Sequence, residues 1–414
     1  MTANTATETL DTLYRRYTRL DPVSLADPYP LFHRLRTESP VFRSGSRFLL
    51  TRYDDVASVL RDPRFSAKRK GRVRKNTSAA PPLSGPTGSH MEALMAWRGR
   101  MMLEADPPDH TRLRSLANHA FTARTVAMMR ERIQRLVDEL LDQAEMQGET
   151  DVIAALAYPL PVIVIAELLG VPPEDRDYIR RWSGMAIAFL DGFRNVTTVD
   201  EARLEFGEYL RKIIVARRAS PRDDLLTAFL DVEEGGSKLD EEELLAMCML
   251  LLIAGHETTT NLIGNSLLTL LRHPDQCAMV RDDPSRLPSA LEELLRYESP
   301  VQIAARVATE DCVIAGVPIA AGTPLTLHLG AANRDPTHFP DPDCFDIART
   351  DNRTLAFGQG AHYCLGAALA RMEGQIALGT LLRRFPNLRL RTEYVEWRPN
   401  TTLRGPTALH VVFD

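Results

Sequence analysis

The chain has 414 residues, with 50 basic residues against 55 acidic ones and a net charge of -5. This length is enough for two or three domains of about 150 residues, but no Gly/Ser linker or change in composition separates two cores, which favours one large domain. Charges of both signs are dispersed along the chain, which excludes a general nucleic-acid binder.

Cysteine usage and hydropathy indicate a reducing compartment. The five cysteines are an odd number and lie far apart, unlike a disulfide framework. Met1 to Thr7 is polar and uncharged, no signal peptide is seen, and the longest apolar runs are shorter than the ~20 residues of a membrane helix. We therefore expect a soluble, cytoplasmic protein with no membrane anchor.

The first elements in chain order are a helix, a strand pair and a second helix. We expect one domain over residues 28–414, preceded by an extension over residues 1–27. Apolar periodicity predicts a helix over Tyr29 to Arg36, strands at Val41-Phe42 and Phe48 to Leu50 across a turn at Gly45, and a helix over Tyr53 to Leu60.

The stretch from Lys68 to Lys75 is strongly basic and is followed by Pro, Ser and Gly up to Ser89. Two interpretations stay open. The stretch is either a solvated, flexible loop or an electrostatic guide for an anionic substrate or carrier protein.

The next helix is predicted to start at Asp106-Pro107-Pro108-Asp109, because Asp caps helices and Pro is tolerated in the first turn. His110 and Arg114 are four residues apart and share one face, where charged side chains usually only stay solvated. Arg112 points elsewhere and could face an acidic partner protein. Three further helical regions follow: Val126 to Met146 with a stripe of Met129, Ile133, Leu136, Leu140 and Leu141, Pro159 to Leu169, and two helices between Asp175 and Arg217 around an irregular stretch, Asp191 to Val196.

Leu244 to Leu271 is the most apolar predicted helix, and we expect it to be central and buried. Its middle, Ala254 to Thr260, contains a glycine that costs ~1 kcal/mol relative to alanine and hydroxyls that can bend the axis. A zinc-protease motif is excluded because Thr260 stands where the second histidine would be. A polar kink satisfied within the helix remains an alternative.

A later helix, Ser289 to Tyr297, carries Glu293 and Arg296 three residues apart on one face. An exposed pair of this kind contributes little to stability, and Glu292 is also within reach of Arg296. The alternating stretch Ser299 to Thr309 predicts a strand.

The segment Phe357 to Gly366 presents a single cysteine, Cys364, directly before a helix of small residues. Two nearby glycines imply a tight turn or a close approach to something flat. A thiol at a helix N-terminus is stabilised as a thiolate. A dinucleotide fingerprint would need a glycine in place of Tyr363, and a zinc site would need more than His362 nearby. A buried structural cysteine does not explain the glycines.

The pattern Phe357-Gly358-x-Gly360-x-His362-x-Cys364-x-Gly366 resembles the haem-binding signature of the cytochrome P450 family. The resemblance implies a mainly α fold with a small β region, of the soluble bacterial type. It also implies haem b (iron protoporphyrin IX) with Cys364 as the iron ligand.

Other motifs match the family in order, from about Pro28 to Phe413. The resemblance makes His110, Arg114, Arg306 and His362 partners of the haem propionates. It makes Glu293, Arg296 and Arg349 a buried network for folding and haem loading. Residues implied to contact the haem also include Ala254, Phe357, Gly358 and Gly366.

In the central helix the resemblance assigns Glu257 to relay protons and Thr258 to hydrogen-bond to oxygen as it is reduced. His256 lies outside the family pattern. Candidate pocket residues, which would be ordinary core in another fold, are Met185, Phe189, Phe193, Leu250, Ile253, Ala254, Ile303, Ala304 and Thr402. Their aliphatic character favours an apolar small-molecule substrate.

The family resemblance implies a monooxygenase that inserts one atom of O2 into a C–H bond or an alkene. No flavin or iron–sulfur motif is found, so electrons should come from NAD(P)H through a ferredoxin reductase and a ferredoxin. Two alternatives stay open: a peroxygenase that uses H2O2, which the pair Glu257-Thr258 disfavours, and a non-catalytic haem sensor or helper, which the presence of Cys364 disfavours.

Overall fold

The computed structural model describes residues 8–68, 86–145, 149–175, 178–179, 182, 196–233 and 236–413. The chain forms two compact units. The first contains residues 1–65, 134–157 and 258–414, and the second contains residues 66–133 and 158–257. Two helices, α8 (Arg130–Glu145) and α13 (Glu241–Arg272), continue from one unit into the other.

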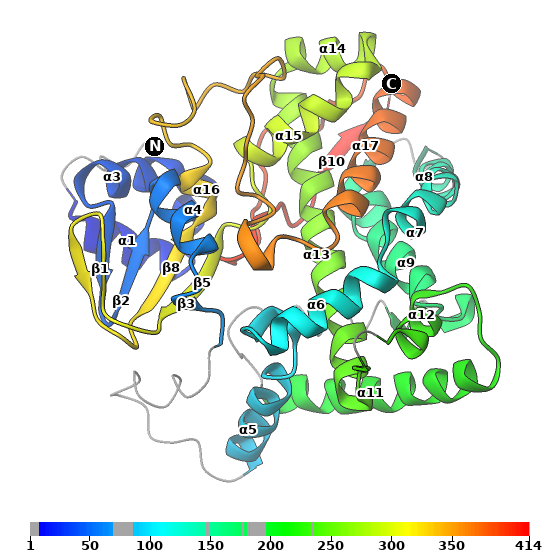
Figure 1. Ribbon diagram of the computed structural model, residues 1–414. Helices are drawn as coiled ribbons and strands as arrows, with labels where there is room; N and C mark the ends of the chain where they lie inside the picture. Colours follow the sequence, from blue (N-terminus) through cyan, green and yellow to red (C-terminus); the bar gives the residue numbers. More distant parts are fainter. Residues whose placement is uncertain are drawn as a thin grey trace. The chain divides into compact units, whose positions relative to one another are not determined.

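The first unit combines the β region with helices from both ends of the chain (Figure 1). Its helices are α1 (Leu10–Thr18), α2 (Pro22–Ala26), α3 (Tyr29–Glu38), α4 (Tyr53–Arg61), α14 (Pro274–Asp282), α15 (Leu287–Tyr297), α16 (Leu329–Ala332) and α17 (Ala367–Arg384). Its strands are β1 (Val41–Ser44), β2 (Arg47–Leu50), β3 (Phe65–Ser66), β4 (Glu149–Asp151), β5 (Ile303–Ala308), β6 (Cys312–Ile314), β7 (Val317–Ile319), β8 (Pro324–His328), β9 (Arg389–Leu390) and β10 (His410–Val412).

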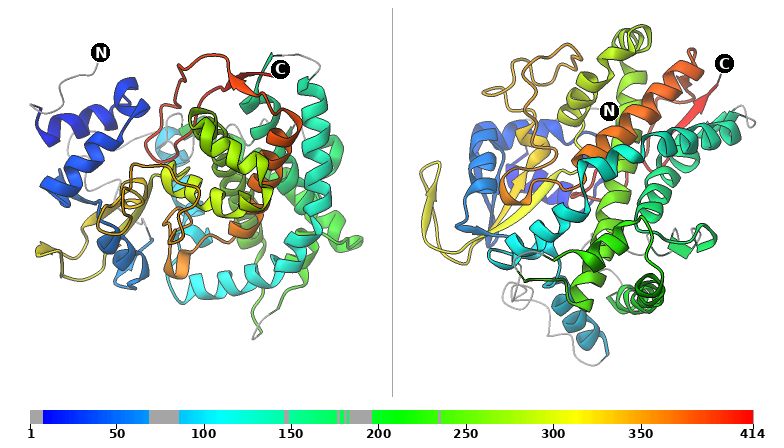
Figure 2. Two further views of the ribbon diagram at one scale, coloured as in Figure 1. Left: turned by 90° about the horizontal axis from the view of Figure 1, so that it is seen from above. Right: turned by 45° about the vertical axis from the view of Figure 1, so that its right-hand side comes forward.

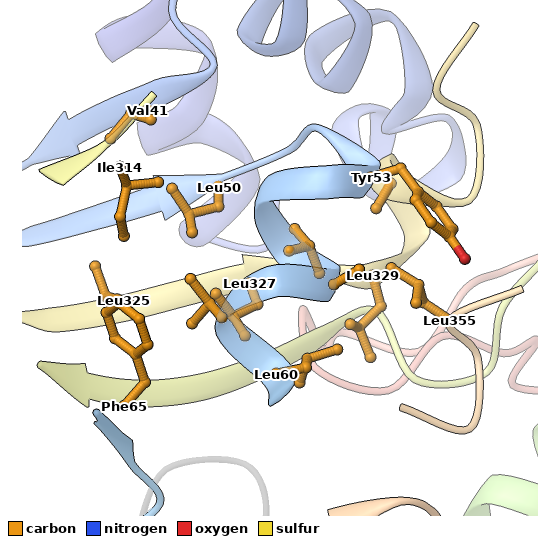
Figure 3. Packing of buried hydrophobic residues seen from close by; sticks show 14 of the residues in the cluster. Val41, Leu50, Tyr53, Leu60, Phe65, Ile314, Leu325, Leu327, Leu329 and Leu355 are labelled. Atoms are coloured by element: carbon orange, nitrogen blue, oxygen red, sulfur yellow. The ribbon is translucent and has the colours of Figure 1, made fainter. Parts of the chain in front are cut away.

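The main sheet joins segments that are far apart in sequence. Within the described chain its strand order is β1-β2-β8-β5-β3, and β2 pairs with β8 in parallel while the β1–β2 and β5–β8 pairs are antiparallel. Apolar residues of β2, β8, α4 and α16 fill one core (Figure 3). In Figure 3 the ring of Tyr53 lies at the edge of this core, and its hydroxyl donates to the carbonyl of Arg353 at 2.6 Å.

A second apolar cluster packs α1, α2 and α3 beside the sheet. It contains the aromatic rings of Tyr14, Tyr17 and Phe32, and the imidazole of His328 lies among them, 5.2 Å from the ring of Phe32 and 6.1 Å from that of Tyr14. Neither nitrogen of His328 has a hydrogen-bond partner in the described part of the chain. Burial therefore lowers the pKa of His328 from 6.5 to about 4 and raises that of Tyr14 to about 12, so both are neutral at pH 7.

This buried imidazole predicts a loss of stability in acid. Because its pKa is lower in the folded than in the unfolded state, His328 stabilises the fold above pH 6.5, and that contribution is lost as the pH falls toward 4. We expect the wild-type protein to lose about 3 kcal/mol more than a His328→Phe variant over this interval. Urea unfolding of both proteins across the interval measures the difference, and His33→Phe is the control, because His33 is an exposed histidine on α3. Parallel curves for wild type and His328→Phe would contradict the prediction.

The second unit is built on α11 (Val196–Ala219). The helices α5 (Pro86–Arg98) and α12 (Leu225–Asp231) pack on α11, and α6 (Asp109–Ala120) packs on α12 (Figure 1). The unit also contains α7 (Ala123–Met128) and α9 (Pro159–Leu168), which follows a π-helical turn at Ile153–Ala157. A contact of 2.8 Å between Nδ1 of His90 and Oδ2 of Asp200 joins α5 to α11.

Most of the predicted elements are confirmed, including the hairpin at Gly45, α6, α9, α13, α15 and β5. The single helix predicted over residues 126–146 is wrong, because the chain forms α7 and α8 with a break at Met129. The amide of Met129 bonds to the carbonyl of Val126, three residues back, which tightens the last turn of α7. Asp106 does not cap α6. Its carboxylate accepts from the hydroxyl of Ser66 and the amide of Ala67.

Candidate haem site

The cysteine loop has a backbone that its glycines make possible. Gly358 and Gly360 have φ angles of +70° and +72°, a region that residues with a Cβ seldom adopt. A Cβ on Gly360 would also lie 2.7 Å from the carbonyl oxygen of Leu60, at the end of α4. Both a positive φ and a close approach therefore require glycine at position 360.

Hydrogen bonds close this loop around Cys364. The amide of Cys364 donates to the carbonyl of Phe357 at 3.0 Å, and that of Gly358 donates to Leu355 at 2.8 Å. On the α4 side, Nε2 of Gln359 donates to the hydroxyl of Tyr53 at 3.4 Å. The thiol of Cys364 is half-buried and precedes the N-terminus of α17, which Gly366 caps without a side-chain hydrogen bond. The positive end of the helix dipole can therefore stabilise a thiolate there.

The other cysteines are less suited to hold a metal. Burial raises the pKa of Cys248, in α13, to about 12, and it also raises the pKa values of Cys277 and Cys312. These thiols stay neutral at pH 7. Cys344 is exposed, and its carbonyl oxygen accepts from Arg296 and Arg349.

The structure brings Glu293, Arg296 and Arg349 together in one buried network. Arg296 donates to both oxygens of Glu293 at 2.7 Å, and Nε of Arg349 lies 3.2 Å from Oε2 of Glu293. Neither Glu293 nor Arg296 is exposed. The carboxylate also accepts from the amide of Asp346 and from Nδ2 of Asn352, both at 3.0 Å. Every charge in the network thus has a partner, which makes its burial tolerable.

Asn333 connects this network to the cysteine loop, and sequence analysis missed it. Its carbonyl accepts from Nη1 of Arg296 at 3.0 Å, its Oδ1 accepts from the amide of Leu355 at 2.7 Å, and its Nδ2 donates to the hydroxyl of Ser299 at 2.8 Å. Asn333 is fully buried. A lone asparagine has no sequence period to mark it, so only the long-range contacts reveal this role.

Strand β5 carries one predicted propionate partner, Arg306, and two predicted pocket residues, Ile303 and Ala304. Arg306 is buried, and its Nη1 donates to the carbonyl of Ala305 at 2.8 Å. Ile303 and Ala304 are half-buried at the start of the strand, next to the turn that holds Thr402, because the amide of Gln302 donates to the carbonyl of Thr402 at 2.8 Å. The structure therefore brings these pocket candidates together. His362 lies in the short helical turn Gly360–His362 of the cysteine loop.

In the second unit, α6 carries His110 and Arg114 one turn apart. His110 is buried and Arg114 is half-buried. The sequence suggested that Arg112 could face a partner protein, but in the structure its guanidinium group is already paired. It forms a forked ion pair with Glu243 at the start of α13 and donates to the carbonyl of Lys238 at 3.3 Å.

The helix α13 runs through Ala254 to Thr260 without interruption, so no break occurs at Gly255. Leu250, Ile253 and Glu257 are buried, whereas Ala254 is exposed and Thr258 is half-buried one turn later. His256 is buried edge-on against the ring of Tyr158, with the ring centroids 4.4 Å apart. Ala254 and Thr258 lie one turn apart and thus form a face of small residues on this apolar helix, and neither of them is fully buried.

Some predicted residues lie outside the described part of the chain. These are the pocket candidates Met185, Phe189 and Phe193 and the basic stretch after Lys68. Lys68 itself has its ammonium group 3.5 Å from a carboxylate oxygen of Asp109.

The residues present fit an iron porphyrin. The loop offers a soft sulfur donor at a helix N-terminus, buried or half-buried Arg and His side chains offer donors for carboxylates, and α13 offers a face of small residues. A closed zinc site is not an alternative among the described residues, because nowhere in them do three or more His, Cys, Asp or Glu side chains come together to hold a metal ion.

Comparisons with known proteins identify the family. The cytochrome P450 family model matches residues 189–401. Cytochrome P450 107B1 of Saccharopolyspora erythraea is 44% identical over 406 residues, which cover 94% of this chain and 96% of that protein. The polyketide biosynthesis cytochrome P450 PksS of Bacillus subtilis is 39% identical over 396 residues, covering 93% and 95%. The crystal structure of P450BioI in complex with hexadec-9Z-enoic acid ligated acyl carrier protein matches with a TM-score of 0.86 and 40% identity, covering 95% and 99%.

The chain therefore belongs to the cytochrome P450 family. It is a monooxygenase of the bacterial type and thus an oxidoreductase of the haem-iron class, and the predicted mainly α fold with a small β region is confirmed. Among the described residues, no helix is both long enough and apolar enough to cross a bilayer.

Proposed function

We propose that this P450 monooxygenase holds haem b through the thiolate of Cys364 and inserts one oxygen atom from O2 into an apolar organic substrate, by hydroxylation or epoxidation. The geometry of the cysteine loop carries this proposal. Its glycines, its closing hydrogen bonds and the N-terminus of α17 all present one sulfur atom. When bound, the haem activates O2 so that one oxygen atom enters the substrate and the other leaves as water.

The remaining haem contacts follow from residue type and burial. We assign His110 and Arg114 to one set of propionate contacts and Arg306 and His362 to the other, because guanidinium and imidazole groups give charge-assisted hydrogen bonds to carboxylates. Ala254, Phe357, Gly358 and Gly366 would lie against the porphyrin, since they are small or flat. The network of Glu293, Arg296 and Arg349 would hold the cysteine loop in place for haem loading.

Two neighbours in α13 are proposed to deliver protons. Glu257 is buried and Thr258 is half-buried on the face of small residues. A carboxylate can pass protons inward from solvent, and a threonine hydroxyl can donate a hydrogen bond at the reacting oxygen. This arrangement supplies protons without admitting bulk water, and it favours an O2-dependent reaction over one driven by H2O2.

Thr258→Ala is expected to uncouple the reaction. Without the hydroxyl, product formed per NADPH should fall about fivefold, the effect of one hydrogen bond of ~1 kcal/mol, while H2O2 release rises. NADPH consumption, product and peroxide are measured side by side. Thr259→Ala is the matched control, because Thr259 is buried on another face of the same helix. Unchanged coupling in Thr258→Ala would remove this role.

Electrons are proposed to come from NAD(P)H through a ferredoxin reductase and a ferredoxin. Reconstitution with surrogate partners tests this directly. Product that requires NADPH, reductase and ferredoxin supports the proposal. Product formed with H2O2 alone indicates a peroxygenase, and normal haem without turnover across a broad ligand panel indicates a non-catalytic sensor or helper.

The substrate is proposed to be an apolar small molecule of secondary or xenobiotic metabolism. The described pocket candidates Leu250, Ile253, Ile303 and Ala304 are aliphatic, and the polyketide and fatty-acyl contexts named for PksS and P450BioI support an apolar ligand. We further propose a cytoplasmic protein whose catalytic domain spans residues 28–414. Ligand-induced displacement of iron-bound water, seen as a shift in the haem spectrum, ranks candidate substrates. A panel in which only charged, polar compounds cause the shift would contradict the proposal.

A further inference from the structure

Arg371, in the second turn of α17, reaches back over the cysteine loop. Its Nε and Nη2 donate to the two carboxylate oxygens of Glu292 in α15, at 2.5 Å and 3.0 Å. Its Nη1 donates to the hydroxyl of Tyr363 at 3.3 Å, and its Cζ lies 4.4 Å from the centre of the Phe357 ring. One guanidinium group therefore contacts both flanks of the loop and a second helix.

These contacts bracket Cys364 in the sequence and in space. Tyr363 directly precedes the cysteine, and Phe357 is the residue whose carbonyl accepts from the cysteine amide at 3.0 Å. The centroids of the two rings are 6.4 Å apart. Movement of either ring would therefore shift the backbone on one side of the sulfur-bearing residue.

Glu292 provides a fixed anchor for this arrangement. It is adjacent to Glu293, whose carboxylate is fully buried in the network with Arg296 and Arg349. The helices α15 and α17 pack side by side, as the right-hand view of Figure 2 shows. The forked ion pair thus ties the cysteine loop to α15, the helix that also carries the buried pair of Glu293 and Arg296. A planar guanidinium can make a bidentate pair and stack on a ring at once, whereas an ammonium group cannot.

We propose that Arg371 is a positioning residue for the iron ligand: it clamps the rings of Phe357 and Tyr363 to α15 and so fixes the direction of the Cys364 sulfur. This role acts through Phe357, Tyr363 and Glu292 and assigns Arg371 no contact with the substrate. The inference rests on the proposed role of Cys364 as the iron ligand. It goes beyond that role, because the family pattern around Cys364 does not include Glu292, Tyr363 or Arg371.

The partial exposure of the clamp separates its effect from general stability. The side chains of Arg371 and Glu292 are 30% and 27% exposed, and an ion pair in that setting contributes little to global folding. Loss of the clamp should therefore act on the loop and leave the fold largely intact. The buried pair of Glu293 and Arg296 differs in this respect.

The test compares Arg371→Gln, Arg371→Lys and Glu292→Gln with Arg384→Gln. Arg384 is on the same helix and forms ion pairs with Asp142 and Glu145 on α8, so it controls for loss of an α17 arginine. Four properties of each holoprotein are measured: the reduced carbon-monoxide spectrum, the haem reduction potential, haem transfer to an apo-globin acceptor, and hydrogen exchange of the amides from Phe357 to Gly366.

We expect Arg371→Gln to lose haem about fivefold faster than wild type, to show a smaller thiolate-type band and a shifted potential, and to exchange the loop amides faster. Glu292→Gln should show a weaker form of the same changes. Arg371→Lys should fall between Gln and wild type, because the charge stays and the fork and the stacking are lost. Arg384→Gln should match wild type in all four properties.

A result in which Arg371→Gln and Arg371→Lys match wild type and Arg384→Gln in all four measurements overturns the inference. If Arg371→Gln melts far below the control, Arg371→Lys and Glu292→Gln decide the test instead, because each of them keeps a polar side chain at the substituted position. Loop exchange and a haem potential equal to those of wild type in these two variants would likewise overturn the inference. Wild-type protein that shows no thiolate-type band at all would instead refute the proposed role of Cys364, so the two failures are distinguishable.

Discussion

Cys364→Ser is expected to lose the thiolate-type band of the reduced carbon-monoxide complex and nearly all turnover. A serine hydroxyl is a hard donor that stays neutral at pH 7, so it cannot push electron density onto iron as a thiolate does. We expect the rate of product formation to fall at least about a thousandfold, which is about 4 kcal/mol of transition-state stabilisation. Spectra and turnover with saturating redox partners measure both effects.

Cys344→Ser is the matched control for this substitution. Cys344 is exposed, and its contacts with Arg296 and Arg349 use the backbone carbonyl, which serine keeps. This variant should retain the wild-type spectrum and turnover. A Cys364→Ser protein with an unaltered thiolate-type band, or a Cys344→Ser protein without one, would place the ligand elsewhere.

Arg296→Met is expected to cost roughly 3–5 kcal/mol of folding stability, which is the range observed when one partner of a buried ion pair is removed. The reason is local. Arg296 is fully buried, donates twice to Glu293 at 2.7 Å, and also donates to the carbonyls of Asn333, Pro342 and Cys344. Methionine fills the space but leaves the carboxylate and these carbonyls short of a donor. Urea unfolding measures the loss, and haem content should fall with it.

Two comparison variants separate charge from geometry. Arg296→Lys keeps a positive charge but lacks the fork, so it should be more stable than Arg296→Met and less stable than wild type. Arg15→Met removes an arginine from an exposed pair with Asp11 on α1 and should change stability by less than about 0.5 kcal/mol. An Arg296→Met protein within that same margin of wild type would show that the network is not a structural requirement.

Local sequence patterns predicted much of this molecule, because local physics decides those elements. The apolar run of α13 admits only a buried helix, the glycines before Cys364 match positive φ angles at Gly358 and Gly360, and the turn at Gly45 joins β1 to β2. The family pattern then identified Glu293, Arg296 and Arg349, which the structure places in contact.

Contacts between distant segments could not be predicted in this way. Arg404 is buried and donates to Glu298 and to the carbonyls of Leu25 and Ala26, and its Cζ lies 3.6 Å from the centre of the Trp397 ring. Neither arginine nor glutamate carries a sequence signal for burial, and the hydrogen-bond partners of Arg404 are 106 to 379 residues away in the sequence. Asn333 and Arg371 escaped notice for the same reason.

Competition for one side chain explains one wrong prediction, the cap at Asp106, and one alternative that helical spacing left open, the partner of Arg296. Asp is a common helix-capping residue, yet the carboxylate of Asp106 accepts hydrogen bonds from the hydroxyl of Ser66 and the amide of Ala67. Glu292 is within helical reach of Arg296, yet Arg296 binds Glu293 and leaves Glu292 to Arg371. Which of two adjacent side chains forms the hydrogen bond or ion pair depends on the residues that the fold brings next to them, and a local sequence pattern does not contain that information.

The most direct test of the account uses the unmodified, purified protein, reduced and exposed to carbon monoxide. Sulfur ligation by Cys364 predicts one bound haem per chain and a strongly red-shifted absorption band of the kind that a thiolate ligand produces. A band of the kind seen with imidazole ligation, or protein that binds no porphyrin after reconstitution with haem, would contradict the central claim that Cys364 holds the iron.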